Sequence, residues 1–467
     1  MLTGENLLKT LMSLANAEEY GGGSRGYLPF LLHAKWELDN GKEGANIVSG
    51  DAEDVKLTLM HKYGCLEIGG LLPNEASVLT RNYDESKYIS GDSMFEYAVQ
   101  TIRSLDLSEG NISRRTLAET FDTYLNMMEA DENSSIRMRN REFASVSKTA
   151  EQVVRLLAGS AESVYDPFAG TGYALTLAGG DPENRRTFRG AEKNPVRCLI
   201  AKIRMDFYGR SADIAAVSTP EFPEITADGT LKKYPLVLSC FNSIRKFANP
   251  QMTLARDRYN RFITTVSADN MNEDRKEFSD RCEAGIILGQ ALSVTAERCI
   301  LFGHGIHEND ITRSMDANQL RSFIFSDLLE AVIQIGDDVR FAERPTTIYL
   351  FNRKKDAKHA GKIYFLKTGE NTYHPQRICE MIQNAEVVPG VSRLVANHAI
   401  PLNLRDCLSL PRHITILQKP EQTNPDAVFR TYSRLEDRGR EISRQIHRVW
   451  GELKFFRYGN GGILRRQ

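Results

Sequence analysis

Residues 164–178, VYDPFAGTGYALTLA, constrain the fold of this chain more than any other stretch. Apolar residues lead into Asp166 and Pro167, glycines follow at Gly170 and Gly172, and an apolar run with helical spacing comes next. This order predicts a buried strand, a tight glycine turn and the start of a helix. The free N–H groups at such a helix start favour a phosphate or carboxylate group, so the turn is a candidate ligand site.

The surrounding pattern predicts an α/β fold with a doubly wound, mostly parallel sheet, because strands and helices alternate between residues 148 and 354. We expect strands at 163–168, 187–194, 234–240, 298–304, 328–336 and 346–354. We expect helices at 148–159, 171–179, 195–209, 283–296 and 317–328. The last two strands are close in sequence and are expected to form an antiparallel closing hairpin. A capping box is predicted at the first helix, with Thr149 as N-cap and Gln152 three residues on.

Helical segments flank this core. Apolar residues recur at helical spacing in 6–19, 25–39, 92–107 and 114–132. We therefore expect a mainly helical N-terminal domain at 1–140, a core at 141–400 and a C-terminal segment at 401–467.

The C-terminal segment predicts a long amphipathic helix at 424–456, whose apolar seam from Leu435 to Leu453 suits a partner helix. From Arg412 onward there are 12 Lys and Arg against 6 Asp and Glu, so the segment is basic. These arginines are either a solvated face or a contact with phosphates or a partner.

Composition excludes several classes of protein. None of the 7 Cys forms a C-x-x-C pair, so neither a disulfide framework nor a zinc ribbon is expected, and a reducing cytoplasm fits best. No apolar run is long enough to span a membrane, and acidic residues interrupt the N-terminal apolar pattern. The formal net charge of −1 does not by itself indicate a nucleic-acid partner.

The glycine turn fits two classes of ligand. A pyrophosphate site has the pattern G-x-G-x-x-G, but Leu175 stands where the third glycine is required. S-adenosylmethionine has a carboxylate, an amino group and a sulfonium, so the carboxylate of Asp166 at the strand end is useful. Glu192, about twenty residues after the glycines, suits the ribose hydroxyls. A third interpretation is an ordinary strand–helix turn with Asp166 as a helix N-cap.

Two segments carry a resemblance to a known family. VYDPFAGTGYAL (164–175) with RGAEKNPVRCLIAKIRMDFYG (189–209) resembles the N6-adenine DNA methyltransferases, and is most similar to the modification subunit of type I restriction–modification systems. That family shares an Asp-Pro-x-x-Gly-[Ser/Thr]-Gly turn and a helix that opens with Glu-x-[Asn/Asp]-Pro. The likeness extends from about residue 95 to 455.

The resemblance implies a Rossmann-like methyltransferase core that uses S-adenosylmethionine. It also implies a hetero-oligomer that binds DNA and docks on a specificity-type subunit through the C-terminal helix; from the residues themselves, no metal is expected. The function implied is DNA adenine methylation in restriction–modification and phage defence. The matching cofactor-binding positions are Thr149, Asp166, Pro167, Phe168, Gly170, Thr171, Gly172, Glu192 and Asn194.

The chain departs from the family at the target base. The family has [Asn/Asp]-Pro-Pro-[Tyr/Phe] after its fourth strand, where this chain has Cys240, Phe241, Asn242 and Ser243. Adenine N6 is a poor nucleophile, so the enzyme needs an acceptor aimed at its hydrogens and an aromatic ring against the flipped base. Asn242 and Phe241 are the candidates for these catalytic roles. After its third strand the family often has Gly-Asp, where this chain has Ser218 and Thr219.

Two functions therefore stay open. One is an active adenine-specific DNA methyltransferase subunit with an unusual target loop. The other is a non-catalytic DNA-binding or assembly subunit of a restriction or phage-defence complex, because the cofactor half matches the family better than the target-base half.

Other candidates have simpler explanations. His304 and His307 suit a polar loop at a strand end better than a metal site. Cys240 is expected to be a small core residue. Phe341 and Arg344 lie in the hairpin loop, which faces DNA in the family that this chain resembles.

Overall fold

The computed structural model describes residues 2–17, 27–42, 47, 50–63, 91–132, 146–179, 186–240, 253–254, 256–262, 285–304, 322–336, 345–369, 371–401, 408 and 410–414. The chain divides into two units, Met1–Thr415 and Ile416–Gln467. The second unit, including the tail helix expected at 424–456, lies outside the described residues. That helix and the division into three expected domains stay predictions. No helix in the described ranges is long and apolar enough to cross a bilayer.

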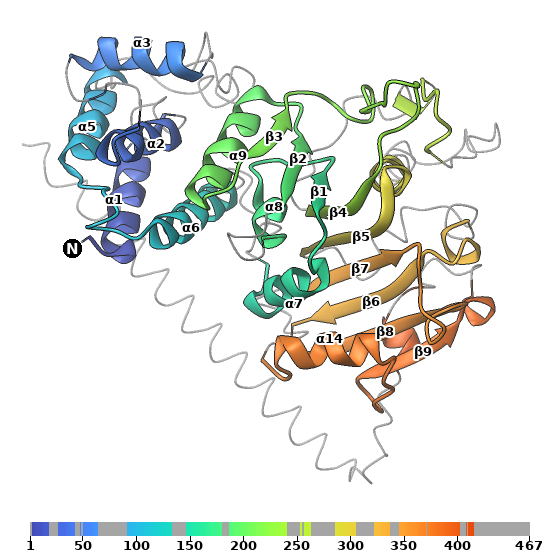
Figure 1. The fold of residues 1–467 in the computed structure, drawn as a ribbon. Coiled ribbons are helices and arrows are strands. Elements are labelled where there is room, and N and C mark those ends of the chain that lie inside the picture. Colours follow the sequence, from blue (N-terminus) through green and yellow to red (C-terminus); the bar gives the residue numbers. More distant parts are fainter. Residues whose placement is uncertain are drawn as a thin grey trace, which may run out of the picture. The chain divides into compact units, whose positions relative to one another are not determined.

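The elements described before residue 146 are helices, as expected, with α3 as an addition to the predicted ones (Figure 1). They are α1 (Gly4–Ala17), α2 (Leu28–Asp39), α3 (Ala52–Tyr63), α5 (Gly91–Ser104) and α6 (Arg114–Glu132). Leu7, Leu11 and Leu14 recur at helical spacing on α1, and all three are buried. They belong to a cluster that also contains Phe207 of α9 (Pro195–Phe207), so α9 shares a core with these helices.

Nine strands among the described residues form one sheet in the order β3-β2-β1-β4-β5-β7-β6-β8-β9 (Figure 1). They are β1 (Ser163–Asp166), β2 (Thr187–Ala191), β3 (Ala212–Ala215), β4 (Tyr234–Cys240), β5 (Thr295–His304), β6 (Leu329–Ile335), β7 (Thr346–Asn352), β8 (Lys362–Thr368) and β9 (Ser392–Ala396). Only β7 and β9 pair antiparallel with their neighbours. The mostly parallel sheet and the closing hairpin of β6 and β7 are thus confirmed. Three strands were not among the six expected ones: β3 at one end of the sheet order, and β8 and β9 at the other.

Helices cover both faces of the sheet, which confirms the doubly wound architecture. On one face lie α7 (Lys148–Ala158), α8 (Tyr173–Leu177), α9 and α14 (Pro375–Gln383), in one cluster with alternate strand residues. Leu288 and Phe323, from helical segments, pack with α15 (Leu410–His413) on the other face. In β4, Leu236 and Leu238 face the first cluster and Val237 faces the second. Burial on both faces explains the continuous apolar run in this strand.

The first core helix begins differently from the prediction. The N-cap of α7 is Ser147, whose hydroxyl accepts a hydrogen bond from the amide of Ala150 at 3.1 Å. Thr149 lies inside the helix and is buried, so the expected capping box at Thr149 and Gln152 is wrong. Ser and Thr cap helices by the same hydrogen bond, so the sequence alone selects poorly between two such residues.

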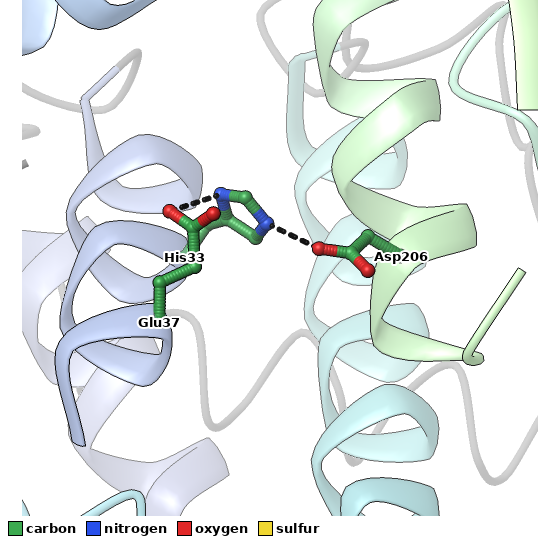
Figure 2. A group of neighbouring side chains, drawn as sticks. All are labelled: His33, Glu37 and Asp206. Carbon is green, nitrogen blue, oxygen red and sulfur yellow. Dashed lines mark hydrogen bonds and ion pairs between the residues drawn. The ribbon is translucent and has the colours of Figure 1, made fainter. Parts of the chain in front are cut away.

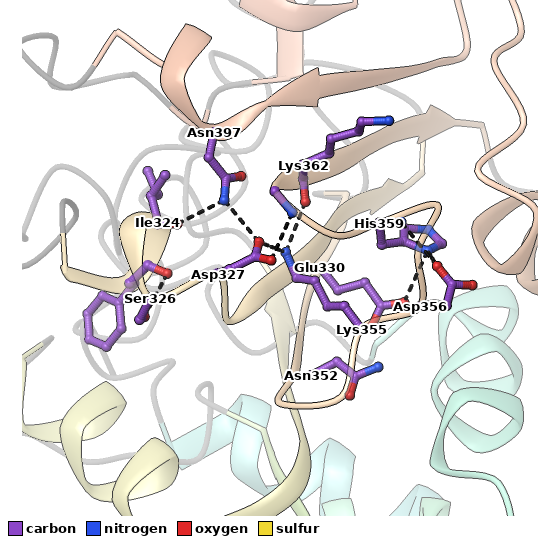
Figure 3. Close-up of polar contacts among 12 residues, drawn as sticks. Ile324, Ser326, Asp327, Glu330, Asn352, Lys355, Asp356, His359, Lys362 and Asn397 are labelled. Carbon is purple, nitrogen blue, oxygen red and sulfur yellow. Dashed lines mark hydrogen bonds and ion pairs between the residues drawn. The ribbon is translucent and has the colours of Figure 1, made fainter.

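A cluster of polar side chains lies at the edge of the sheet formed by the N-terminal ends of β6 and β8 (Figure 3). Asp327 has a positive φ of 54° and accepts hydrogen bonds from Lys355 (2.6 Å), Asn397 (2.9 Å) and the amide of Gly361 (2.8 Å). Lys355 also donates to the carbonyl of Lys362 at 2.9 Å. Parallel strands begin at the same edge, so this cluster lies opposite the end of β1, where the glycine turn follows.

Candidate functional site

The candidate site begins at the glycine turn after β1. Gly170 and Gly172 have φ angles of 54° and 85°, a region that glycine occupies without strain. A Cβ atom on Gly172 would lie 3.1 Å from Cα of Ala201 in α9, so the turn also packs too closely for a larger residue. Gly172 is the N-cap of α8, which has only 5 residues. Because so short a helix has a small dipole, the expected anion preference does not follow from α8 alone.

Asp166 is the most unusual side chain in this turn. It is completely buried, and its Oδ1 accepts hydrogen bonds from the amide of Phe168 (2.9 Å) and the hydroxyl of Ser239 (2.6 Å). Its Oδ2 is buried without a hydrogen-bond partner in the described residues. Burial raises the pKa of Asp166 to about 7, although both hydrogen bonds oppose the shift. Since Gly172 caps α8, the interpretation of Asp166 as its N-cap is wrong.

Glu192 and Asn194 reach the same edge of the sheet from β2. Asp166 pairs with Gly190 in the parallel register, and the charge of Glu192 contributes to the raised pKa of Asp166. Oε1 of Glu192 accepts a hydrogen bond from the amide of Asn194 at 2.9 Å. The Asn194 side chain caps α9 by accepting from the amide of Val196 at 2.9 Å. The structure thus brings Glu192 to the glycine turn, while Asn194 mainly fixes the start of α9.

The other predicted cofactor positions are buried or hydrogen-bonded around the turn. Thr149 and Phe168 are buried, and the carbonyl of Pro167 accepts a hydrogen bond from the hydroxyl of Thr219 at 2.8 Å. The side chain and the carbonyl of Thr171 accept from one Arg204 nitrogen at 3.0 and 3.2 Å. Thr171 therefore faces α9.

Arg204 ties the turn to the N-terminal helices. Its guanidinium is 1% exposed, and its Nε donates to Asp122 of α6 at 2.5 Å. Tyr208 donates to the second oxygen of Asp122 at 2.6 Å. The Arg204 guanidinium carbon also lies 5.4 Å from the ring centroid of Tyr173, the first residue of α8. Neither Arg204 nor Ser239 was among the predicted site residues. A polar residue at the end of the buried run YPLVLSC was the only signal for Ser239.

Both residues expected at the target base fall outside the described ranges. Phe241 and Asn242 lie outside the described residues, as do His307, Phe341, Arg344 and the side chain of His304. Cys240 is the last residue of β4 and is buried in the core, as expected.

A second group of ionisable side chains joins α2 to α9 (Figure 2). His33, Glu37 and Asp206 place one ligand atom each within 4.8 Å of the others, which is compatible with a metal ion. However, Nε2 of His33 lies 3.0 Å from Asp206 and its Nδ1 lies 2.9 Å from the Tyr63 hydroxyl, so both nitrogens are engaged. Three basic side chains lie within ion-pair distance of the two carboxylates: Lys42, Lys62 and Arg114. Because these cations already balance the charge, we interpret the group as an interhelical ion-pair network.

Two solved structures resemble this fold along almost their whole length. The methyltransferase subunit of the type I restriction–modification system from Streptococcus thermophilus gives a TM-score of 0.57 at 12% identity, covering 88% of this chain and 100% of that chain. A second chain comes from a study of complex assembly and conformational transition of the type I restriction–modification system. It gives a TM-score of 0.53 at 14% identity, covering 98% of this chain and 99% of that chain.

This chain resembles those subunits in fold. The family resemblance seen in the sequence is therefore confirmed at the level of the fold, and identities this low carry the likeness no further. No protein-family model matches the chain, and no curated protein matches it either.

Proposed function

We propose that this chain is a modification-type methyltransferase subunit that binds S-adenosylmethionine at the glycine turn. The observation that carries the proposal is the buried Oδ2 of Asp166, which has no partner among the described residues. A carboxylate oxygen in that state suits a ligand that brings a positive charge. S-adenosylmethionine has two such groups, its amino group and its sulfonium, whereas a pyrophosphate would be repelled.

The remaining residues of the turn fit the same ligand. Gly170 and Gly172 allow a ligand to approach the backbone closely, and Glu192 supplies a second carboxylate for the ribose hydroxyls. Pro167, Phe168 and Thr171 shape the turn, Thr149 is buried in α7 beside it, and Asn194 caps α9. When bound, the cofactor supplies an electrophilic methyl group.

The substrate that we propose is adenine in DNA, methylated at N6. Asn242 would accept a hydrogen bond from the amino group and Phe241 would stack on the flipped base. The proposed assembly includes DNA and a specificity-type subunit bound by the C-terminal helix, within a cytoplasmic restriction–modification or phage-defence complex. The division into 1–140, 141–400 and 401–467 belongs to the same proposal.

A second candidate function is a non-catalytic DNA-binding or assembly subunit that keeps the cofactor site. The sequence Cys240, Phe241, Asn242 and Ser243 favours it, because both prolines of the family motif are missing. Losing one aimed acceptor typically costs about 10²–10³ in rate. If this second candidate holds, methyl transfer should be very slow or absent while binding is intact.

One experiment separates the two functions. Calorimetry first measures S-adenosylmethionine binding, and tritium transfer to adenine-containing DNA is then measured with partner subunits present. Incorporation that Asn242→Ala abolishes would establish the enzyme with Asn242 as acceptor. Incorporation that Asn242→Ala leaves unchanged would mean that another residue is the acceptor. No incorporation with cofactor and DNA bound favours the assembly subunit, and no cofactor binding at millimolar ligand refutes the proposed cofactor site.

A further inference from the structure

The loop after β3 is held by a side chain that comes from beyond β4. Arg261 is 6% exposed and belongs to residues 256–262, which follow the proposed target-base loop in the chain. One of its terminal nitrogens donates to the carbonyl of Thr219 at 3.1 Å, and the other donates to the carbonyl of Pro220 at 2.7 Å. The first nitrogen also donates to Gln290, which is fully buried.

A carboxylate balances the charge of Arg261. Oδ1 of Asp257 accepts a hydrogen bond from Nε of Arg261 at 2.8 Å, and Asp257 also accepts from the amides of Tyr259 and Arg261. Burial alone would raise the pKa of Asp257, but these hydrogen bonds outweigh it and hold the pKa below its ordinary value. The arrangement uses the planar fork of a guanidinium, which a lysine ammonium cannot reproduce.

The contact continues to the glycine turn in one further step. Thr219 accepts from Arg261 through its carbonyl and donates through its hydroxyl to the carbonyl of Pro167, the residue after Asp166. Residues 256–262 also pack tightly against the helical segment 285–293. A Cβ atom on Gly289, in the helical segment 285–293, would lie 2.6 Å from the carbonyl oxygen of Arg261.

We propose that Arg261 is a positioning residue that fixes the loop after β3 against the glycine turn. The segment beyond the target-base loop and the cofactor site are thereby ordered together. The identity of the ligand at the glycine turn is the part of this inference that rests on the proposed function. Because coupling between sites is reciprocal, a bound cofactor also orders residues 256–262.

The test compares Arg261→Gln and Arg261→Lys with a matched control, Arg353→Gln, in the full chain. Arg353 donates to the carbonyls of Leu292 at 2.8 Å and Thr295 at 2.9 Å, at the end of the segment that holds Gln290. Neither contact involves the glycine turn or the loop after β3.

The first readout is hydrogen exchange in the absence of ligand. The amides of Glu221 and Phe222 both donate to the carbonyl of Ser218, at 3.1 and 2.8 Å, and report on the loop after β3. We expect Arg261→Gln to speed their exchange by about tenfold or more, with a smaller change in Arg261→Lys and none in Arg353→Gln. Unchanged exchange in both Arg261 variants, or equal acceleration over the whole core, overturns the proposal.

The second readout is affinity for S-adenosylmethionine. We expect Arg261→Gln to weaken binding about 10–100-fold, Arg261→Lys to weaken it less, and Arg353→Gln to change it less than about twofold. If Arg261→Gln does not fold, Arg261→Lys decides. If the wild-type protein binds S-adenosylmethionine and both Arg261 variants bind it equally well, the coupling is refuted. The proposed function is not affected by that result. Wild-type protein that does not bind refutes the proposed cofactor, and the exchange of the loop amides then decides the role of Arg261.

Discussion

Two carboxylates at opposite edges of the sheet have opposite environments. Asp327, where β6 begins, has both oxygens engaged: Lys355 and Asn397 donate to Oδ1, and the amide of Gly361 donates to Oδ2. Burial opposes its ionisation, but these donors outweigh it and hold the pKa of Asp327 below its ordinary value. Asp166, where β1 ends, keeps Oδ2 without a partner in the described residues, and its pKa is raised to about 7.

The difference between the two carboxylates separates a polar side chain that stabilises the fold from one that suits a ligand. A satisfied carboxylate stabilises the fold and has no need of a ligand. A buried carboxylate with one empty oxygen destabilises the protein when ionised, and a cationic ligand relieves that cost. The comparison therefore supports the proposed ligand site at the edge with the glycine turn, and four predictions test it.

Removing the carboxylate of Asp166 should have the largest effect. We expect Asp166→Ala to weaken S-adenosylmethionine binding about 100-fold or more, because the ligand cation loses its buried counter-charge. Calorimetry measures this directly, and Asp327→Asn is the matched control at the other edge. Equal affinity of Asp166→Ala and wild type would break the comparison.

The second prediction is a pH dependence of binding. In the free protein the pKa of Asp166 is about 7, so its ionised fraction grows as the pH rises towards 7. A cationic ligand favours the ionised form, so binding should release a proton and strengthen between about pH 5 and 7, by up to about tenfold per unit. Above pH 7 the Asp166 contribution should level off. In Asp166→Asn the rise should disappear, and a rise that persists there belongs to another group.

At the other edge, the third prediction concerns stability. Asp327→Asn keeps the shape and tolerates the positive φ, but removes the hydrogen-bonded counter-charge of the buried Lys355 ammonium. Asp327 is about one third exposed, so we expect a modest loss of about 1 kcal/mol in the free energy of unfolding. Cofactor affinity should not change. Denaturant titration gives the stability, and a large loss of affinity would show that the two edges are not independent.

The sequence predicted the elements better than their contacts. The run YPLVLSC and the glycines after Asp166 are local signals, so β4 and the turn were predicted correctly. The strands β8 and β9 were missed, because the short segments KIYFLKT and SRLVA lie beyond the expected hairpin. The likeness to modification subunits indicated the fold, which the solved structures confirm.

The partners of the site could not be read from the sequence in the same way. Ser239 reaches Asp166 across 73 residues, and Arg261 reaches Thr219 across 42. Such contacts depend on which strands become neighbours and on where loops return, neither of which has a local pattern. Nothing near Arg261 distinguishes it from a surface arginine until the helical segment with Gln290 packs beneath it.

The last prediction is a gain in stability from Asp166→Asn in the ligand-free protein. The folded pKa of Asp166 is raised above its ordinary value, so the folded state holds the proton more tightly than the unfolded state does. Stability from this group is therefore full at low pH and is lost as the pH rises through about 7. Asparagine keeps the acceptor for Ser239 and Phe168 but has no charge to bury. We expect the melting temperature of the ligand-free Asn variant to exceed that of wild type at pH 8, and the gap to close at pH 5. Asp327→Asn is the control, and it should instead lower the melting temperature at pH 8.

A lower melting temperature for Asp166→Asn than for wild type at pH 8 would mean that the Asp166 carboxylate has a partner in the free protein. That result would remove the argument for a cationic ligand at this edge of the sheet.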